Sequence, residues 1–317
     1  MPMETECVIA ARLSCTDSDC SAHSLTLLRP PLNIRDPRSH LRQFLPTLNR
    51  HAVHRSNAGL ALADMSASLR GWRIVLLLGW TEIAKRYRRS ALGPFWLTLS
   101  MAGTIGSLSL VYSYLFGLRL EAYLPFLTVG FVLWSFLSQS IVDASTAYSA
   151  NGGFLLQIRI PRFTFPLQLM FRQLVILAHN SVVLLVVLVV FPPSYSASTL
   201  LFIPAFALLV LFSAALATIT ATLCTRFRDL PQAVASLMQI AFFITPVIWM
   251  PTQLPSERQF IVDGNPLAIL IDLARAPLLG GTVSDDLWLQ AIAFTVVAMG
   301  LAFIIFARFR ARISYWL

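Results

Sequence analysis

Five stretches of the chain contain no Asp, Glu, Lys or Arg: residues 90–118, 122–142, 173–225, 230–256 and 287–307. A helix needs about 20 apolar residues to cross the hydrocarbon core of a bilayer, so the third stretch is long enough for two spans. The double proline Pro192-Pro193 divides it, because proline ends a helix. The pattern therefore predicts an all-α membrane protein with six transmembrane helices. We expect them over about 95–117, 123–142, 166–191, 199–223, 232–250 and 287–307.

A helix with one apolar face is expected before the first span. Over residues 69–89 the apolar side chains recur at steps of three and four, and most charged side chains fall elsewhere. The charge-free centre, residues 74–81, is too short to cross a bilayer. We therefore expect an amphipathic helix in the membrane interface, with Trp72 and Trp80 at headgroup depth. The alternative is a helix that packs on other helices of the protein.

The first 64 residues differ from the rest of the chain. They are rich in Ser, Pro, Arg and His and show no sustained apolar period, so we expect disorder, or else translation that begins at Met65. Cys20 and His23 lack the two tight ligand pairs of a tetrahedral zinc site, and no metal site is predicted. The expected division is an extension over 1–64, an interface helix and loop over 65–94, and a transmembrane domain over 95–317.

The net charge of +9 comes largely from arginines between the apolar stretches, where they set topology, so nucleic-acid binding is not expected. With six spans, thirteen cations flank one face and three flank the other, which places both termini in the cytoplasm. The thirteen are Arg70, Arg73, Lys85, Arg86, Arg88, Arg89, Arg159, Arg162, Arg226, Arg228, Arg308, Arg310 and Arg312, and the three are Arg119, Arg258 and Arg275.

Two connecting segments are expected to form short helices. Residues 154–160, after Gly152-Gly153 and before Pro161, are apolar and basic but too short to span, which indicates a cytoplasmic surface helix. In the outer loop over 251–286, Asn265-Pro266 is a helix-start signal ahead of an apolar run. We expect a short helix there, on the outer face or dipping back into the membrane.

Several kinds of chemistry are disfavoured by the residues present. Lys85 is the only lysine, and its surroundings lack the second glycine and the Ser/Thr of a P-loop, so this chain is not expected to bind ATP. Asp143 lies at the end of the second span and no other acid lies within a predicted span, which disfavours ion-coupled transport. In the third span, Gln168, Arg172 and His179 share one helical face. That face either lines a path for a polar substrate or makes hydrogen bonds between helices.

Several motifs of residues 70–317 resemble the membrane subunit of bacterial ABC exporters for lipid-linked polysaccharides, of the O-antigen, capsule or teichoic-acid type. The motifs are residues 87–96, 123–126, 133–136, 151–154, 158–162, 179–180, 226–229 and 265–267. The resemblance implies a permease in the bacterial inner membrane that works as two copies with two ATP-binding subunits. It also implies that ATP and Mg bind to the partner subunit and that the substrate is a polysaccharide on polyprenyl diphosphate. The outer loop would form gating helices.

The resemblance and the chemistry of the substrate that it implies give three groups of candidate site residues. At the substrate entrance, arginine can bind phosphate bidentately and glycine permits a tight loop, although topology alone also explains the cations. The entrance candidates are Arg86, Arg88, Arg89, Leu92, Gly93 and Pro94. The candidates for coupling to the ATPase are Phe154, Leu156, Ile158, Arg159, Arg226, Arg228 and Asp229.

The third group would line the translocation path, because sugar rings present C–H faces that pack on aromatic rings. An interfacial aromatic belt is the alternative for these aromatic residues. The path candidates are Tyr112, Phe116, Phe131, Trp134, His179, Asn180 and Phe242. The alternative functions are an ABC permease for a drug or lipid and a membrane-embedded sugar-lipid enzyme.

Overall fold

The computed structural model describes residues 57–88, 93, 95–253 and 255–317. The regular elements of this part are all helices, which confirms the all-α prediction. Five described helices are long and apolar enough to cross a membrane. They are α4 (Phe95–Phe116), α5 (Leu120–Ala144), α8 (Thr164–Val190), α9 (Phe202–Cys224, preceded by the 3-10 helix η1, Ala197–Leu201) and α13 (Asp285–Phe309).

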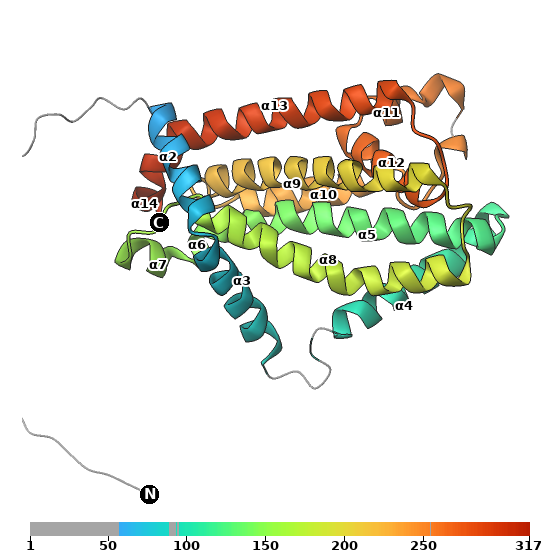
Figure 1. The fold of residues 1–317 in the computed structure, drawn as a ribbon, viewed down its shortest axis with the longest axis horizontal. Coiled ribbons are helices and arrows are strands. Elements are labelled where there is room, and N and C mark those ends of the chain that lie inside the picture. Colours follow the sequence, from blue (N-terminus) through green and yellow to red (C-terminus); the bar gives the residue numbers. More distant parts are fainter. Residues whose placement is uncertain (1–56, 89–92, 94, 254) are drawn as a thin grey trace, which may run out of the picture. The chain divides into compact units, whose positions relative to one another are not determined.

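The helices α5, α8, α9 and α13 run side by side (Figure 1). Their contact faces hold fully buried apolar side chains such as Leu127 and Leu137 of α5 and Leu209 of α9. Small residues, among them Ala217 of α9 and Ala291 of α13, let the backbones approach closely. The five spans differ in burial: α5 is the most buried and α4 the least.

The fifth predicted span is shorter than expected. Helix α10 (Leu230–Ile244) has 15 residues and ends six residues before the predicted boundary at 250. At 1.5 Å per residue it is about 22 Å long, less than the roughly 30 Å of a hydrocarbon core. Thr245 has extended backbone angles because the following Pro246 disfavours the helical conformation in the residue before it. The count of six complete spans therefore stays a prediction.

The chain after α10 returns through short helices: η2 (Pro251–Gln253), η3 (Ser256–Arg258), α11 (Phe260–Asp263) and α12 (Pro266–Leu278). The start of α12 is as predicted, since the Asn265 side chain accepts a hydrogen bond from Leu267 N at 3.0 Å. Helix α12 packs against α5, α9 and α13 and is largely buried. Arg275, expected among the outer-loop cations, is therefore inside the bundle and 3% exposed.

Two helices replace the single helix expected over 69–89. Helix α2 (Asn57–Arg70) and helix α3 (Trp72–Tyr87) meet at Gly71 and cross the long helices at a steep angle (Figure 1). Trp72 and Trp80 are exposed, whereas Gly79 packs on α8: an added Cβ there would lie 2.6 Å from the Phe171 ring. The position of α3 at a membrane interface stays a prediction.

The predicted boundary at residue 64 falls inside α2, because residues 57–64 are helical. Asp64 is buried, and its Oδ2 accepts hydrogen bonds from the backbone N–H groups of Arg162 and Phe163, at 3.1 and 3.3 Å, just before α8 begins. Its Oδ1 pairs with Arg310 at 3.4 Å. The carboxylate thus joins α2 to the start of α8 and the end of α13. The expectation of disorder for residues 1–56 lies outside the described residues.

Short helices gather at one end of the long helices: α6 (Ala147–Ala150), α7 (Gly152–Gln157), η4 (Arg310–Arg312) and α14 (Ile313–Trp316). We name this the α7 end. The opposite end, which carries α11 and the turn at Pro192-Pro193, is the α11 end (Figure 1). The α7 end corresponds to the side on which the sequence places the coupling segments, and the α11 end to the outer loop.

Candidate functional site

Aromatic residues from three helices line one groove. Tyr112 of α4, Phe131 and Trp134 of α5, and Phe242 of α10 border a cavity of about 610 Å³. The Phe242 ring lies 6.0 Å from that of Phe131 and 5.6 Å from that of Trp134, centroid to centroid. The structure therefore brings together four of the five predicted aromatic path residues. We call this the aromatic groove.

The remaining lining of the aromatic groove is apolar or neutral and polar. Among the described residues that line it, none carries a charge. The hydroxyl of Ser135 donates to Phe131 O of its own helix at 2.7 Å, and that of Thr104 donates to Ser100 O at 2.8 Å. The side-chain amides of Gln139 and Gln239 are exposed and supply both donors and acceptors. The groove thus offers ring faces and exchangeable hydrogen bonds to a neutral ligand.

Three predicted path residues lie outside this lining. The Phe116 ring lies 5.5 Å from that of Tyr112, centroid to centroid, but does not border the cavity. His179 of α8 contacts its own helix through Nδ1 and Val175 O, at 2.8 Å, and its carbonyl accepts a hydrogen bond from Thr98 of α4 at 3.2 Å. Asn180 beside it is 5% exposed. The structure therefore places His179 and Asn180 at a helix contact, apart from the aromatic residues.

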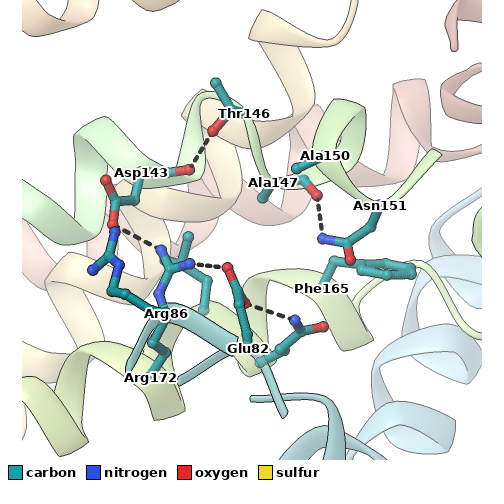
Figure 2. A pocket seen from close by; sticks show the side chains of 11 residues that line it. Glu82, Arg86, Asp143, Thr146, Ala147, Ala150, Asn151, Phe165 and Arg172 are labelled. Atoms are coloured by element: carbon teal, nitrogen blue, oxygen red, sulfur yellow. Dashed lines mark hydrogen bonds and ion pairs between the residues drawn. The ribbon is translucent and has the colours of Figure 1, made fainter. Parts of the chain in front are cut away.

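A second polar group lies at the α7 end. The Arg172 guanidinium of α8 forms ion pairs with Glu82 of α3 and, at 2.7 Å, with Asp143 of α5 (Figure 2). Gln168 donates to the other Glu82 oxygen at 2.9 Å, and Gln173 donates to Asp143 at 2.8 Å. We call these five residues the Arg172 cluster. They join three helices through charge-assisted hydrogen bonds.

The Arg172 cluster borders a cavity of about 140 Å³ that reaches the short helices. Thr146 and Asn151, next to α6 and α7, line it together with Arg86 of α3 (Figure 2). Two buried polar atoms of the cluster, Gln168 Oε1 and Arg172 Nε, have no hydrogen-bond partner in the described part of the protein. A cavity of this size with polar walls suits ordered water, which bridges such atoms. The cavity thus lies between the cluster and Asn151, which directly precedes α7.

The predicted entrance residues are only partly described. Arg86 lines the small cavity, and Arg88 is exposed directly after α3. Gly93 has a φ of +54°, a left-handed conformation that glycine adopts without the steric cost of a Cβ. The tight loop expected at that position stays a prediction. Arg89, Leu92 and Pro94 lie outside the described residues.

The predicted coupling residues share the α7 end. Phe154 of α7 is 44% exposed and Ile158 is 52% exposed, and Arg159 is exposed beside them. The side chain of Leu156 lies outside the described part. Arg226, Arg228 and Asp229 are exposed in the connection from α9 to α10. The Arg226 guanidinium lies 5.5 Å from the ring centroid of Trp316 in α14, and α14 packs on α7, so the two coupling segments are neighbours.

The sequence profile of the ABC-2 type transporter family matches residues 74–279, more than half of the chain. The chain belongs to the ABC-2 type transporter family. The matched part of this ABC-2 permease contains the aromatic groove, the Arg172 cluster and α12. Its apolar helices make it a multi-pass membrane protein.

Curated relatives of this ABC-2 permease carry a more specific name. The chain is 26% identical over 229 residues to the O-antigen export system permease protein RfbA of Klebsiella pneumoniae, which covers 69% of this chain and 87% of that protein. A second Klebsiella pneumoniae protein of this name is 24% identical over the same shares. RfbA of Myxococcus xanthus is 28% identical over 228 residues, or 69% of this chain and 85% of that protein.

Reasoning from the sequence missed Glu82 and Asp143 as partners of Arg172. In the sequence, Glu82 is one of several charged residues within 69–89, and Asp143 is the acid at the end of the second predicted span. The available signal was the pairing of opposite charges beside a polar helix face, since charges at membrane depth are found paired. Of the two interpretations of the Arg172 face, the structure shows contacts between helices.

Proposed function

We propose that this ABC-2 permease exports a polysaccharide linked to polyprenyl diphosphate, of the O-antigen or capsule type, across the bacterial inner membrane. The energy comes from ATP hydrolysis in a separate subunit. The names of the relatives support the substrate class. The observation that carries the proposal is the aromatic groove, about 610 Å³ in volume and bordered by five aromatic rings, with no charged side chain among the described residues that line it.

The groove suits a polymer of sugars for a physical reason. Apolar C–H faces of the sugar rings pack on Tyr112, Phe131, Trp134 and Phe242, and these contacts need no fixed pattern of hydroxyl groups. A polymer must move through successive positions, so weak and interchangeable contacts are better than a few strong ones. The absence of charge from the described lining agrees with this requirement. A single groove can therefore accept each repeat in turn.

The proposed assembly has two copies of this chain and two ATP-binding subunits. The α7 end faces the cytoplasm, where Phe154, Ile158 and Arg226 contact the ATPase. Helices α4 and α10 border the groove and leave many of their apolar side chains exposed, which supports a second copy as the element that closes the groove. The path that polysaccharide takes then runs between the two copies. This chain itself catalyses no reaction.

The entrance for the lipid diphosphate is proposed at the start of the first span. Arg86 and Arg88 lie at the end of α3, and arginine pairs bidentately with phosphate oxygens. The left-handed Gly93 lets the backbone turn tightly before α4. The rival explanation, cations that only set topology, predicts that lysine at both positions preserves export. Double replacement by lysine with reduced export and normal insertion therefore supports the entrance.

The test of the proposed function is export by the purified complex. The chain and its ATP-binding partner are reconstituted in proteoliposomes, and a lipid-linked polysaccharide is followed from the side of the ATPase to the other side. We expect ATP-dependent transfer that falls at least tenfold when Trp134 and Phe242 are both replaced by Ala. Val189→Ala, on an exposed surface of α8, is the control and leaves transfer unchanged. Transport of an amphiphilic drug without any transfer of polysaccharide would instead identify a drug permease.

A further inference from the structure

The chain leaves helical conformation at residues 245–250 and remains inside the protein. Thr245 and Val247 are 0% exposed, and Pro246 and Ile248 are also buried. Within the apolar part of a membrane protein, non-helical backbone needs hydrogen-bond partners from the protein itself. The origin of those partners shows what holds this segment in place.

Three side chains, one of the segment itself and two of other helices, supply the missing donors. Trp249 Nε1 donates to Phe243 O at 3.0 Å, and Arg275 Nη1 of α12 donates to Pro246 O at 3.0 Å. The Tyr123 hydroxyl of α5 donates to Ile248 O at 2.5 Å. Three carbonyls that would otherwise lack a helical partner are thereby satisfied. Two of the donors belong to elements that are distant in the sequence.

Neighbouring residues on α12 and α5 fix the position of the Arg275 side chain. Its guanidinium pairs with Asp272 one turn earlier on α12 and lies 3.8 Å from the ring centroid of Phe126 on α5. Gly130, one turn further along α5, leaves room for the guanidinium because it has no side chain. An added Cβ would lie 3.0 Å from Arg275 Nη1 and 3.4 Å from Val247 O. Because its charge is neutralised locally, this arginine can hold a neutral carbonyl.

The segment held in this way borders the aromatic groove. Phe243, in the last turn of α10, and Ile248, within segment 245–250, line the groove. The side-chain amide of Asn265, at the start of α12, donates to Thr245 Oγ1 at 3.0 Å. Hydrogen bonds therefore link segment 245–250, at one edge of the groove, to Asn265 at the start of α12 and to Arg275.

We propose that Tyr123 and Arg275 are positioning residues that hold segment 245–250 against α5 and close the aromatic groove toward the α11 end. Opening of the groove for export releases Ile248 O from Tyr123 and Pro246 O from Arg275. The substrate then passes where Ile248 lay. This inference rests on the proposed function, which makes the groove the path of the polysaccharide.

The experiment measures access to the groove directly. Ile248→Cys is introduced after the native cysteines are replaced by serine, and the complex without ATP or substrate is reacted with a membrane-impermeant maleimide from the side of the α11 end. Tyr123→Phe removes one hydroxyl and keeps the ring. We expect it to raise the labelling rate about fivefold, the factor that corresponds to about 1 kcal/mol for one lost hydrogen bond. Tyr114→Phe, at an exposed position on α4, is the matched control and leaves the rate unchanged.

A second variant keeps the test decisive if one substitution impairs folding. Arg275→Lys retains the charge beside Asp272 but lacks the planar guanidinium over Phe126, and we expect a labelling rate between those of the parent and Tyr123→Phe. Parental labelling rates in both variants would overturn the inference. Because labelling needs no transport, its outcome is separate from the export assay: parental labelling with normal export rejects only this inference, and raised labelling without any polysaccharide export rejects the proposed substrate.

Discussion

Each end of the bundle contains a buried arginine, but the two are neutralised in different ways. Arg172 at the α7 end pairs with Glu82 and Asp143, which belong to two other helices. Arg275, which is 3% exposed, pairs with Asp272 of its own helix. The charge of Arg172 is thus neutralised only when three helices assemble, whereas the partner of Arg275 is present as soon as α12 forms.

The difference explains what each arginine can hold. A buried charge must be paired, and removal of one partner leaves the other uncompensated. At the α7 end the pairing itself joins α3, α5 and α8. Near the α11 end, Asp272 already neutralises the charge of Arg275. The guanidinium therefore donates a hydrogen bond to the Pro246 carbonyl and lies over the Phe126 ring. We therefore predict that stability depends on charge pairing at the α7 end and on close packing around Arg275.

The largest effect is expected from Arg172→Met, because it leaves two carboxylates without their partner. Glu82 and Asp143 have side-chain exposures of 38% and 31%, so solvent relieves part of the penalty. We expect a loss of about 3 kcal/mol in stability, at the lower end of the range for broken buried ion pairs. Thermal unfolding of the purified complex in detergent, followed by tryptophan fluorescence, measures this loss.

The control for that prediction removes the charges together. Arg172→Met combined with Glu82→Gln and Asp143→Asn leaves no stranded ion, and we expect it to recover most of the lost stability. If Arg172→Met alone unfolds at the parental temperature, the cluster does not hold the three helices together. Equal loss in the single and the triple variant would mean that packing, and not charge, is the important property of this site.

A medium effect is expected from Gly130→Ala near the α11 end. The new Cβ would lie 3.0 Å from Arg275 Nη1 and 3.4 Å from the Val247 carbonyl, so the arginine and the segment must shift. Overpacking of this kind costs roughly 1–3 kcal/mol. Gly300→Ala is the matched control, since nothing lies within 4 Å of its added Cβ, and it should be neutral or stabilising by up to about 1 kcal/mol. The same unfolding assay compares them, and equal behaviour would contradict a close fit at Gly130.

The smallest effect is expected from Asp64→Ala, which removes hydrogen bonds to two backbone N–H groups and a pair with Arg310. We expect a loss of about 1.5 kcal/mol in stability, at the lower end of the range for hydrogen bonds to a charged group, because Arg310 lies toward the end of the bundle. Asp64→Asn keeps an acceptor for the N–H groups and should lose less stability than Asp64→Ala. Protease digestion of the bundle provides the measurement, and unchanged digestion of Asp64→Ala would show that α2 is held by other contacts.

The spans were largely predictable from the sequence because membrane helices need long runs without charge. The runs that became α4, α5, α8, α9 and α13 are continuous and apolar. The early end of α10 was missed although Pro246 signalled it, since the apolar run continues past the break. Gly71 similarly marked the division between α2 and α3.

The candidate site was predictable from the sequence only where residue type alone indicated a role. Aromatic residues at the middle of predicted spans were identified, and four of them meet in the groove. The Arg172 cluster joins residues 29 and 90 positions apart in the chain, so a single sequence contains no local pattern that pairs them. The same holds for Tyr123 and Ile248, because a hydrogen bond to a backbone carbonyl leaves no mark in the sequence of its acceptor.

The most direct test of the central proposal is covalent capture of the substrate in the aromatic groove. A photo-reactive phenylalanine derivative is placed at Gln239, which borders the groove, and in a second sample at Val189, which is exposed on α8. Cells that synthesise the lipid-linked polysaccharide are irradiated, and the purified chain is analysed for attached glycan. The account predicts a glycan adduct at position 239 and none at 189. Glycan attached equally at both positions, or at neither while export continues, would contradict it.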